Sequence, residues 1–321
     1  MNELSKDAVN WLTIGDEASG QRIDNFLIRV LKGVPKSHVY RILRSGEVRI
    51  NKGRAGPDTR LAAGDVVRVP PVRTADPATR PAAPSPKAAE RLPILFEDDH
   101  LLVVDKPAGV AVHGGSGVAH GVIEQMRAAR PQARFLELVH RLDRDTSGVL
   151  LLAKKRAALV NLHEQIRDGT VDKRYLVLVR GKWRDEIRRV RLALHKFTTR
   201  EGERRVRVDA GEGQAAETVF RRLATWPQRE VPLALLEAEL VTGRTHQIRV
   251  HLAHLGYPLA GDDKYGDFAW NKVLGREGLK RMFLHARSLA FVHPATGEAV
   301  AFEAPWPPEL AAFVATLGPA A

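Results

Sequence analysis

Apolar residues near the start of the chain recur at helical spacing, and those that follow alternate with polar ones. A first helix is predicted from one apolar face made of Ile23, Phe26, Leu27, Val30 and Leu31. Pro35 begins a second predicted helix and Gly46 ends it, because proline suits the first turn of a helix and glycine suits the position after its last turn. Residues 47–53 and 64–69 alternate between apolar and polar side chains, which predicts two half-buried strands.

Longer apolar runs follow in the rest of the chain. Residues 94–109 predict a hairpin that Pro107 ends, and residues 148–153 are apolar throughout, which is typical of a buried strand. Amphipathic patterns predict one helix at 118–130 and another at 155–168. The remaining expected elements are a strand at 171–181, hairpins within 183–216, a strand at 235–241 and a helix at 245–255 that Gly256 ends.

The basic charge of the protein is concentrated in its first part. The 321 residues carry 50 Lys and Arg against 38 Asp and Glu, a net charge of +12, and the pI is about 10.1. Residues 20–73 alone hold 12 Lys and Arg against 4 Asp and Glu, which is two thirds of the excess in about a sixth of the chain. This distribution predicts a small basic module attached to a nearly neutral body, and a polyanionic partner for the module.

Composition also predicts where the two parts meet and where the protein acts. Residues 71–90 contain five prolines and six alanines, so we expect a semi-extended linker between a domain at 18–70 and a domain at 91–321. The absence of cysteine excludes disulfides and thiolate metal sites. There is no apolar run of about 18 residues and no secretion signal at the start, so we expect no membrane association and a cytoplasmic protein.

A polar loop stands directly before the apolar run at 148–153. The segment from His140 to Ser147 holds two carboxylates, two guanidinium groups, an imidazole and two hydroxyl groups. A polar loop on a buried strand is a common way to hold reactive groups on a rigid base. A surface turn with local Arg–Asp pairs would have the same composition, since exposed ion pairs are common and contribute little to stability.

Three segments together resemble motifs of one enzyme family. The loop His140-Arg-Leu-Asp-Arg-Asp-Thr-Ser-Gly148 resembles the signature loop of the RluA-type pseudouridine synthases, which isomerise uridine in structured RNA. The segments Asp105-Lys-Pro-Ala-Gly109 and Thr242-Gly-Arg-Thr-His-Gln-Ile-Arg-Val-His251 are similar to further motifs of that family. The basic module resembles an S4-type RNA-binding domain in its Pro35-Lys-Ser segment and in its Gly64-Asp-Val-Val strand. The resemblance implies an α+β protein with a small S4-like domain and a mixed, mainly antiparallel catalytic core.

The resemblance also implies roles for three residues. Asp143 corresponds to the catalytic aspartate, which acts either as a nucleophile or as a base. Arg249, the second arginine of its motif, is expected to pair with Asp143 and to keep it charged in a dry site. Tyr175 matches the active-site tyrosine that stacks on the flipped base and could take the C5 proton, although a tyrosine at a strand entrance is usually a packing residue. Since the isomerisation involves neither redox chemistry nor group transfer, no cofactor is expected.

The implied partner is large-subunit (23S) ribosomal RNA, and we expect the protein to act as a monomer. The hairpins at 183–216 are expected on the RNA-facing side. Contacts with RNA are predicted for basic residues of the module and of the two catalytic motifs, namely Arg22, Lys36, Arg41, Arg44, Arg49, Lys52, Arg141, Arg144 and Arg244.

Three other functions fit parts of the sequence. His246, His251 and His254 could suggest a metal site, but their spacing of five and then three does not match a helical zinc pair with a third ligand, so no metal is expected. A glycoside hydrolase also cleaves a bond at C1′, but it needs two carboxylates on opposite sides of the sugar, and Asp143 and Asp145 are close in sequence. A non-catalytic RNA-binding protein would leave the larger domain without a role.

Overall fold

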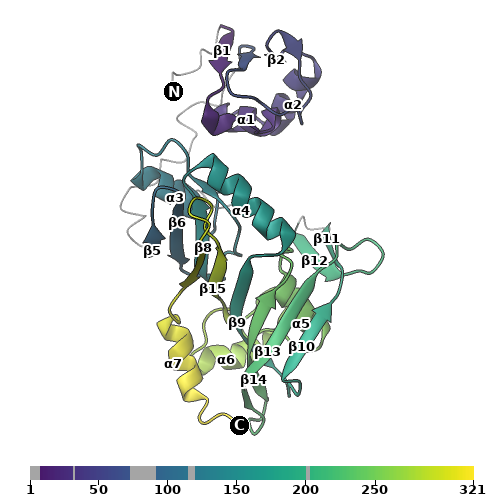
Figure 1. Cartoon of the computed structure of the whole chain (residues 1–321). Helices are drawn as coiled ribbons and strands as arrows, with labels where there is room; N and C mark the ends of the chain where they lie inside the picture. The colour runs from purple at the N-terminus through teal and green to yellow at the C-terminus, as the bar shows by residue number, and fades with distance from the viewer. Residues whose placement is uncertain (1–7, 32, 73–91, 115–119, 200–202) are drawn as a thin grey trace. The chain divides into compact units, whose positions relative to one another are not determined.

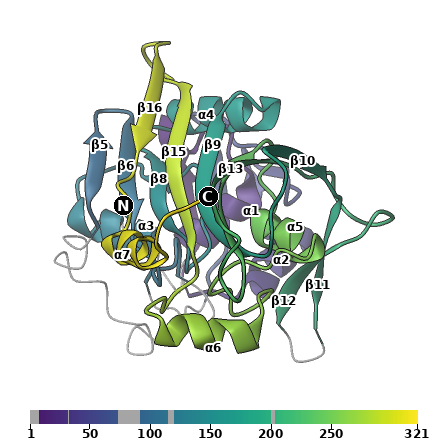
Figure 2. The ribbon, with the colours of Figure 1, turned by 90° about the horizontal axis from the view of Figure 1, so that it is seen from below.

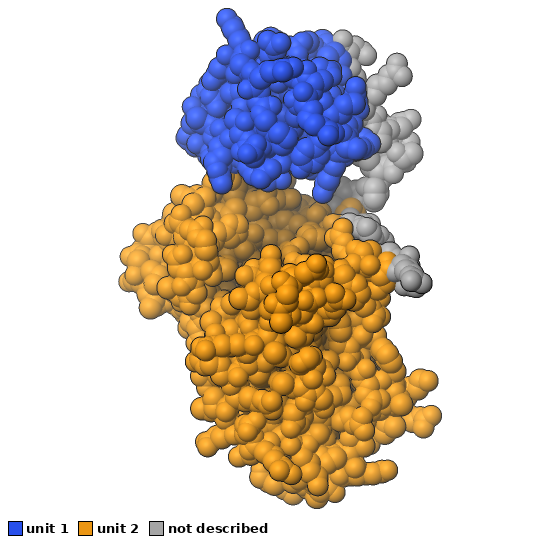
Figure 3. Space-filling model, turned by 90° about the vertical axis from the view of Figure 1, so that its right-hand side faces the viewer, with its two compact units in different colours: residues 1–83 blue, residues 84–321 orange. Residues whose placement is uncertain are grey.

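A computed structural model of the chain describes residues 8–31, 33–72, 92–114, 120–199 and 203–321. The chain divides into two compact units, residues 1–83 and 84–321, which Figure 3 shows in different colours. Most of the predicted linker lies outside the described residues. Val72, which the sequence analysis assigns to that linker, is instead buried in the core of the first unit.

The first unit packs two helices against a small antiparallel sheet. The helices are α1 (Ile23–Val30) and α2 (Lys36–Arg44), and a short 3-10 helix, η1 (Asp16–Ala18), precedes them. The sheet has the order β1-β4-β2-β3 and consists of β1 (Asn10–Thr13), β2 (Arg49–Ile50), β3 (Gly53–Arg54) and β4 (Val66–Val69). Both predicted helices and the strand within 64–69 are present. The first strand, β1, was not predicted because four residues give too short a pattern.

The second unit is built on a ten-stranded sheet (Figure 1). The strand order is β10-β13-β14-β9-β15-β8-β6-β5, with β16 paired to β15 and β7 paired to β8. The strands are β5 (Ile94–Glu97), β6 (Leu101–Lys106), β7 (Glu137–Leu138), β8 (Ser147–Ala153), β9 (Asp172–Arg180), β10 (Ile187–Arg191), β13 (Glu217–Trp226), β14 (Leu233–Leu240), β15 (Leu284–Val292) and β16 (Ala299–Glu303). Within the described residues, the pairing of β15 with β8 is parallel and the other pairings are antiparallel. A separate hairpin is formed by β11 (Leu194–Thr198) and β12 (Arg204–Val208).

The central strands are apolar throughout because both faces of the sheet are covered. In β6, Leu102 and Val104 belong to one hydrophobic cluster, whereas Leu101 and Val103 belong to another. Such two-sided burial explains a continuous apolar run in place of an alternating one. The helices surround the sheet (Figure 2). The cluster with Leu102 includes residues of α3 (Val122–Ala129) and α5 (Gln247–His254), and the clusters on the opposite face include residues of α4 (Arg156–Asp168), α6 (Phe268–Arg276) and α7 (Pro308–Thr316).

The structure has the α+β fold that the sequence analysis predicted. The predicted strand at 148–153 is β8, and the predicted helices at 155–168 and 245–255 are α4 and α5. The helix predicted at 118–130 begins at Val122, since residues 115–119 lie outside the described part of the chain. No helix in the described residues has both the length and the hydropathy needed to cross a bilayer.

Candidate active site

The loop that carries Asp143 is anchored at its start. Leu142 is buried in the same hydrophobic cluster as α5, and the imidazole Nε2 of His140 accepts a hydrogen bond from the main-chain N–H of Leu151 at 3.1 Å. Burial lowers the pKa of His140 to about 4, which keeps the ring neutral and able to accept. The loop therefore approaches β8 in a fixed conformation.

A buried lysine holds the same loop from another side. The ammonium group of Lys106 donates hydrogen bonds to the carbonyl oxygens of Pro107 (2.9 Å), Val110 (2.7 Å) and Arg144 (2.9 Å). The main-chain N–H of Gly109 donates to the same oxygen of Arg144, also at 2.9 Å. Burial lowers the pKa of Lys106 to about 7, but three acceptors require all three protons of the charged form. The Asp-Lys-Pro-x-Gly motif thus serves to position the loop of Asp143.

The structure brings Asp143 and Arg249 together, as the sequence analysis predicted. Nη1 of Arg249, on the buried side of α5, donates to Oδ2 of Asp143 at 2.9 Å. The other two donors of the guanidinium, Nε and Nη2, hold both carboxylate oxygens of Asp262 at 2.7 and 2.8 Å. Asp262 is fully buried and also accepts hydrogen bonds from the main-chain N–H groups of Lys264 and Tyr265. Arg249 is therefore shared by two carboxylates.

The two carboxylates of Arg249 lie in different environments. Burial acts to lower the pKa of Arg249, but the hydrogen bonds and charges of Asp262 and Asp143 outweigh it and raise that pKa. Burial acts to raise the pKa of Asp262, and Arg249 outweighs it, so Asp262 stays ionised. The side chain of Asp143 is 25% exposed, and no described residue donates a hydrogen bond to its Oδ1. Asp262 accepts hydrogen bonds from two of the three guanidinium nitrogens of Arg249. Asp143 accepts from the third through Oδ2, which leaves its Oδ1 available for chemistry.

His246 lies beside the same carboxylate. Its Nε2 is 3.7 Å from Oδ1 of Asp143, and its Nδ1 is 2.8 Å from the hydroxyl oxygen of Tyr265. That hydroxyl accepts a hydrogen bond from the main-chain N–H of Val206 in β12, and the ring of Tyr265 lies under the guanidinium of Arg249 at 5.2 Å. His246 has a positive φ of 55°, which is uncommon for a residue with a side chain.

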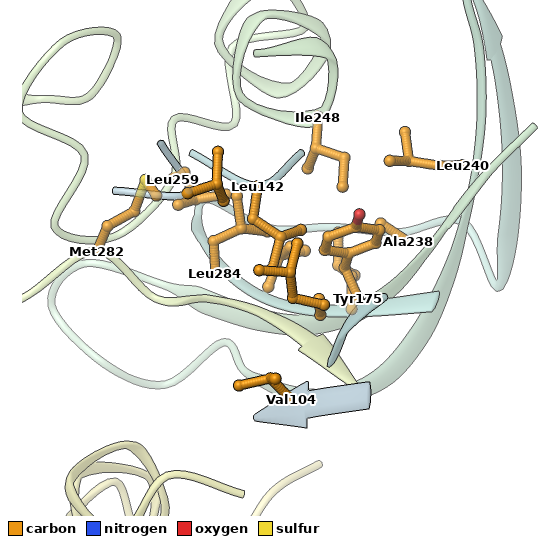
Figure 4. Close-up of a cluster of buried hydrophobic side chains, with 14 of the residues drawn as sticks. Val104, Leu142, Tyr175, Ala238, Leu240, Ile248, Leu259, Met282 and Leu284 are labelled. Atoms are coloured by element: carbon orange, nitrogen blue, oxygen red, sulfur yellow. The ribbon is translucent and has the colours of Figure 1, made fainter. Parts of the chain in front are cut away.

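Tyr175 lies in the hydrophobic cluster on this face of the sheet. It shares that cluster with Ala238, Leu240 and Ile248 (Figure 4). Burial, together with the charge of Asp143, raises the pKa of its phenol. Among the described residues, none forms a hydrogen bond with its hydroxyl group. The side chain is therefore an apolar, un-ionised ring near the carboxylate of Asp143.

The other two histidines of the α5 segment do not face this carboxylate. Both ring nitrogens of His251 are engaged, Nδ1 with the hydroxyl of Thr218 at 3.0 Å and Nε2 with the carbonyl oxygen of Leu192 at 3.1 Å. His254 lies at the end of the helix, away from the core. A search of the described residues finds no group of three His, Cys, Asp or Glu side chains that could hold a metal ion.

The basic residues predicted to contact RNA lie in two sets. Arg141, Arg144 and Arg244 are exposed in the second unit, and Arg144 forms an ion pair with Asp145 on the same loop. The set in the first unit lies on α2, on β2 and in the β2–β3 turn, and consists of Lys36, Arg41, Arg44, Arg49 and Lys52. Arg22 differs from these, because two of its guanidinium nitrogens bind the buried carboxylate of Asp24.

Comparison with known proteins assigns this arrangement to a class of enzyme. Residues 100–254 match the family of RNA pseudouridylate synthases, and residues 21–67 match the S4 domain. The chain is 54% identical over 304 residues to the ribosomal large subunit pseudouridine synthase C of Haemophilus influenzae, covering 94% of this chain and 93% of that one. It is 53% identical over 302 residues to the protein of the same name from Escherichia coli, covering 93% of each. The chain therefore belongs to the RluA-type pseudouridine synthases, enzymes that isomerise uridine in RNA.

Solved structures show the same fold. The human RNA pseudouridylate synthase domain containing 1 matches with a TM-score of 0.57 at 27% identity, over 70% of this chain and 88% of that chain. The human RNA pseudouridylate synthase domain containing 4 matches with the same TM-score at 26% identity, over 72% of this chain and 95% of that chain.

Three residues of this site were not predicted from the sequence. Asp262 and Tyr265 lie in the segment Gly261-Asp-Asp-Lys-Tyr-Gly266, for which no role was predicted, and Lys106 was predicted only as part of a motif. A signal was present, because two glycines around an Asp-Asp-Lys-Tyr turn mark a tight loop with several polar groups. The partner of Asp262, which is Arg249, could not be identified from spacing alone.

Proposed function

We propose that the protein isomerises uridines of large-subunit ribosomal RNA to pseudouridine and that Asp143 is the reactive carboxylate. The observation that carries the choice of substrate is the 53–54% identity, over more than nine tenths of each chain, to proteins named for the large ribosomal subunit. The S4 domain and its basic charge support a structured RNA as the substrate.

The reaction requires three steps on one nucleotide. The bond between N1 and C1′ breaks, the uracil turns within the site, and C5 bonds to C1′ and loses its proton while N1 gains one. A uridine stacked in structured RNA must first be flipped out, which costs a few kcal/mol that contacts with the RNA backbone offset. Neither redox chemistry nor group transfer is involved, so one carboxylate in a suitable environment suffices.

Oδ1 of Asp143 is the atom best placed for this chemistry. Oδ2 is held by Arg249, whereas Oδ1 accepts no hydrogen bond from the described residues. Attack on C1′ and removal of a ribose proton are both open to a carboxylate, and both would use the same unbound oxygen. The buried guanidinium binds the carboxylate through Oδ2 and does not cover the oxygen that reacts.

Tyr175 would form one wall for the flipped uracil. A phenol ring in an apolar cluster offers a surface on which a base can stack. Because burial raises its pKa, the tyrosinate needed to take the C5 proton is disfavoured. We assign Tyr175 to base stacking, the role that its place in an apolar cluster supports.

The basic residues would hold the RNA around the flipped nucleotide. Arg141, Arg144 and Arg244 lie on exposed loops of the second unit, and the set on α2, on β2 and in the β2–β3 turn would contact other phosphates of the RNA.

The test is to map pseudouridine in large-subunit ribosomal RNA from cells that lack the protein. Uridines should appear where pseudouridine stood, and expression of the wild-type protein, but not of an Asp143→Asn variant, should restore the modification. An unchanged pseudouridine map would show that the proposed substrate is wrong. Release of free uracil from the RNA would instead indicate a glycosidase.

A further inference from the structure

The side chains of Asp143 and His246 are both partly exposed, so a substrate can reach them. The side chain of Asp143 is 25% exposed and that of His246 is 16% exposed. Nε2 of His246 lies 3.7 Å from Oδ1 of Asp143, which is longer than a hydrogen bond, and Nε2 forms no hydrogen bond within the described residues. Nε2 is therefore available for a ligand that reaches Oδ1 of Asp143.

The surroundings of the two ring nitrogens decide which of them carries the proton. Nδ1 of His246 lies 2.8 Å from the hydroxyl oxygen of Tyr265, which also accepts the main-chain N–H of Val206 at 2.9 Å. Nε2 faces the carboxylate oxygen Oδ1 of Asp143 at 3.7 Å, where a lone pair would be repelled, so the proton is favoured on Nε2 and Nδ1 accepts from the hydroxyl group of Tyr265. A neutral imidazole that accepts at Nδ1 carries its proton at Nε2, so a donor faces the reactive site.

The backbone also holds the ring in this place. His246 adopts the left-handed conformation at the start of α5, with φ 55° and ψ 20°. For a residue other than glycine this conformation is unfavourable and persists only where the surroundings require it, most often at functional sites. The edge-on contact of its ring with Tyr265, at 5.4 Å between centroids, completes the support.

We propose that His246 recognises the 2′-hydroxyl group of the target nucleotide, with Nε2–H donating to the 2′ oxygen. This inference rests on the proposed function. Oδ1 of Asp143 must reach C1′ or the hydrogen on C2′, and the 2′ oxygen is bonded to C2′. Nε2 of His246 lies 3.7 Å from Oδ1 of Asp143. It is therefore close to the place that the 2′ oxygen takes when the ribose is in position to react. The 2′-hydroxyl is the group by which a protein distinguishes RNA from DNA at a single site.

Within this arrangement Tyr265 is a positioning residue. It touches no reacting atom, but it selects the tautomer of His246 and supports Arg249 from below. Its link to Val206 also connects the site to the hairpin of β11 and β12.

The experiment pairs enzyme variants with a change of one oxygen in the substrate. The substrate is a synthetic fragment of large-subunit ribosomal RNA around a uridine that the mapping experiment identifies, made either with uridine or with 2′-deoxyuridine at that position. Single-turnover rates of isomerisation are measured for the wild-type protein and for His246→Asn, because asparagine tolerates the left-handed conformation. His254→Asn, at an exposed position of the same helix, is the matched control.

We expect the rate losses caused by the 2′-deoxy substitution and by His246→Asn to be non-additive. Removing the 2′-hydroxyl should slow the wild-type protein roughly tenfold to a hundredfold, the effect of one missing hydrogen bond in a partly buried site. His246→Asn should be slowed by a similar factor on the all-ribose RNA and should then lose less than about a further twofold on the deoxy RNA. His254→Asn should show the same difference in rate between the all-ribose and the deoxy RNA as the wild-type protein. Tyr265→Phe, which retains the ring and loses the hydroxyl, should reduce the difference between the two RNAs.

Several results would overturn the inference. If removal of the 2′-hydroxyl slows His246→Asn by the same factor as the wild-type protein, the imidazole does not recognise the 2′-hydroxyl. A His246→Asn protein that is folded but inactive on both RNAs, or a wild-type protein that cannot convert the deoxy RNA at all, would show a larger role than one hydrogen bond. If the wild-type protein leaves the all-ribose RNA unmodified, the proposed function itself is wrong and this inference fails with it.

Discussion

The buried ammonium group of Lys106 donates a hydrogen bond to the main-chain carbonyl oxygen of Arg144, the residue next to Asp143. Lys106→Met keeps the apolar stem and removes the three donors. We expect the free energy of unfolding to fall by roughly 1–3 kcal/mol, because buried carbonyl oxygens lose their partner. The rate of isomerisation should fall at unchanged RNA affinity, since the loop of Asp143 loses a support. Chemical denaturation and single-turnover assays measure both, with exposed Lys272→Met as control; equal rates for the two variants would contradict the positioning role.

Two aspartates of the same loop should respond differently to the loss of charge. Asp143→Asn should abolish pseudouridine formation while RNA affinity, set mainly by phosphate contacts, barely changes. Asp145→Asn should lose far less activity, because Asp145 pairs only with the exposed Arg144 among the described residues. The measurement is pseudouridine yield on the same RNA. An inactive Asp145→Asn protein beside an active Asp143→Asn protein would move the catalytic role by two residues.

The second carboxylate bound to Arg249 is expected to be structural as well as electrostatic. Asp262→Asn should destabilise the protein by roughly 3–5 kcal/mol, since it leaves a buried guanidinium without its main partner. Asp263→Asn is a matched control, because Asp263 is 75% exposed and lies 3.7 Å from Nη2 of Arg249. Combining Asp262→Asn with Arg249→Met should cost less than the two single changes together. Equal stability of the Asp262 and Asp263 variants would refute this role.

Basic residues of the first unit should control the salt dependence of RNA binding. Replacing Lys36, Arg41 and Arg44 by Gln should reduce the slope of log affinity against log salt by about 0.7–0.9 for each phosphate that is no longer neutralised. Arg22→Gln should instead affect mainly the stability of the first unit, because Arg22 binds the buried Asp24. Filter binding at several salt concentrations tests the triple variant. An unchanged slope would show that these residues do not bind RNA.

Stability should fall in mild acid because of buried neutral histidines. Burial lowers the pKa of His285 to about 4, below the value of about 6.5 in an unfolded chain. The stabilisation is therefore fully present above about pH 6.5 and is lost as the pH falls towards 4, by up to about 1.4 kcal/mol per pH unit for this one proton. In His285→Gln the slope of unfolding free energy against pH should decrease by about one proton. Exposed His254→Gln should keep the wild-type slope, and identical slopes for the two variants would contradict the assignment.

The elements with clear periodicity could be predicted from the sequence. β8 and α4 have strong patterns, since β8 is buried on both faces and α4 on one. The pairing of Asp143 with Arg249 was predicted from the resemblance of two motifs, which identified residues that lie 106 positions apart. Short elements such as β1 gave no comparable signal, and neither did α7, whose residues 310–315 are all apolar and therefore show no periodicity.

The supports of the site could not be predicted, because they depend on tertiary contacts. Lysine is rarely buried, and only the meeting of three carbonyl oxygens makes the position of Lys106 favourable. The role of Asp262 depends on a loop that follows α5 and folds back to Arg249. Tyr265 joins His246 to a strand that lies 59 positions earlier in the chain, a distance over which no local pattern operates.

The place of β15 in the sheet joins the two halves of the candidate active site. This strand lies between β8, which continues the loop of Asp143, and β9, which leads through β14 to the helix of Arg249. β15 spans Leu284–Val292 and follows both motifs in the chain. Without it, the strands that carry the two motifs have no shared neighbour in the sheet. A chain truncated before β15 should therefore be inert even though it contains both motifs.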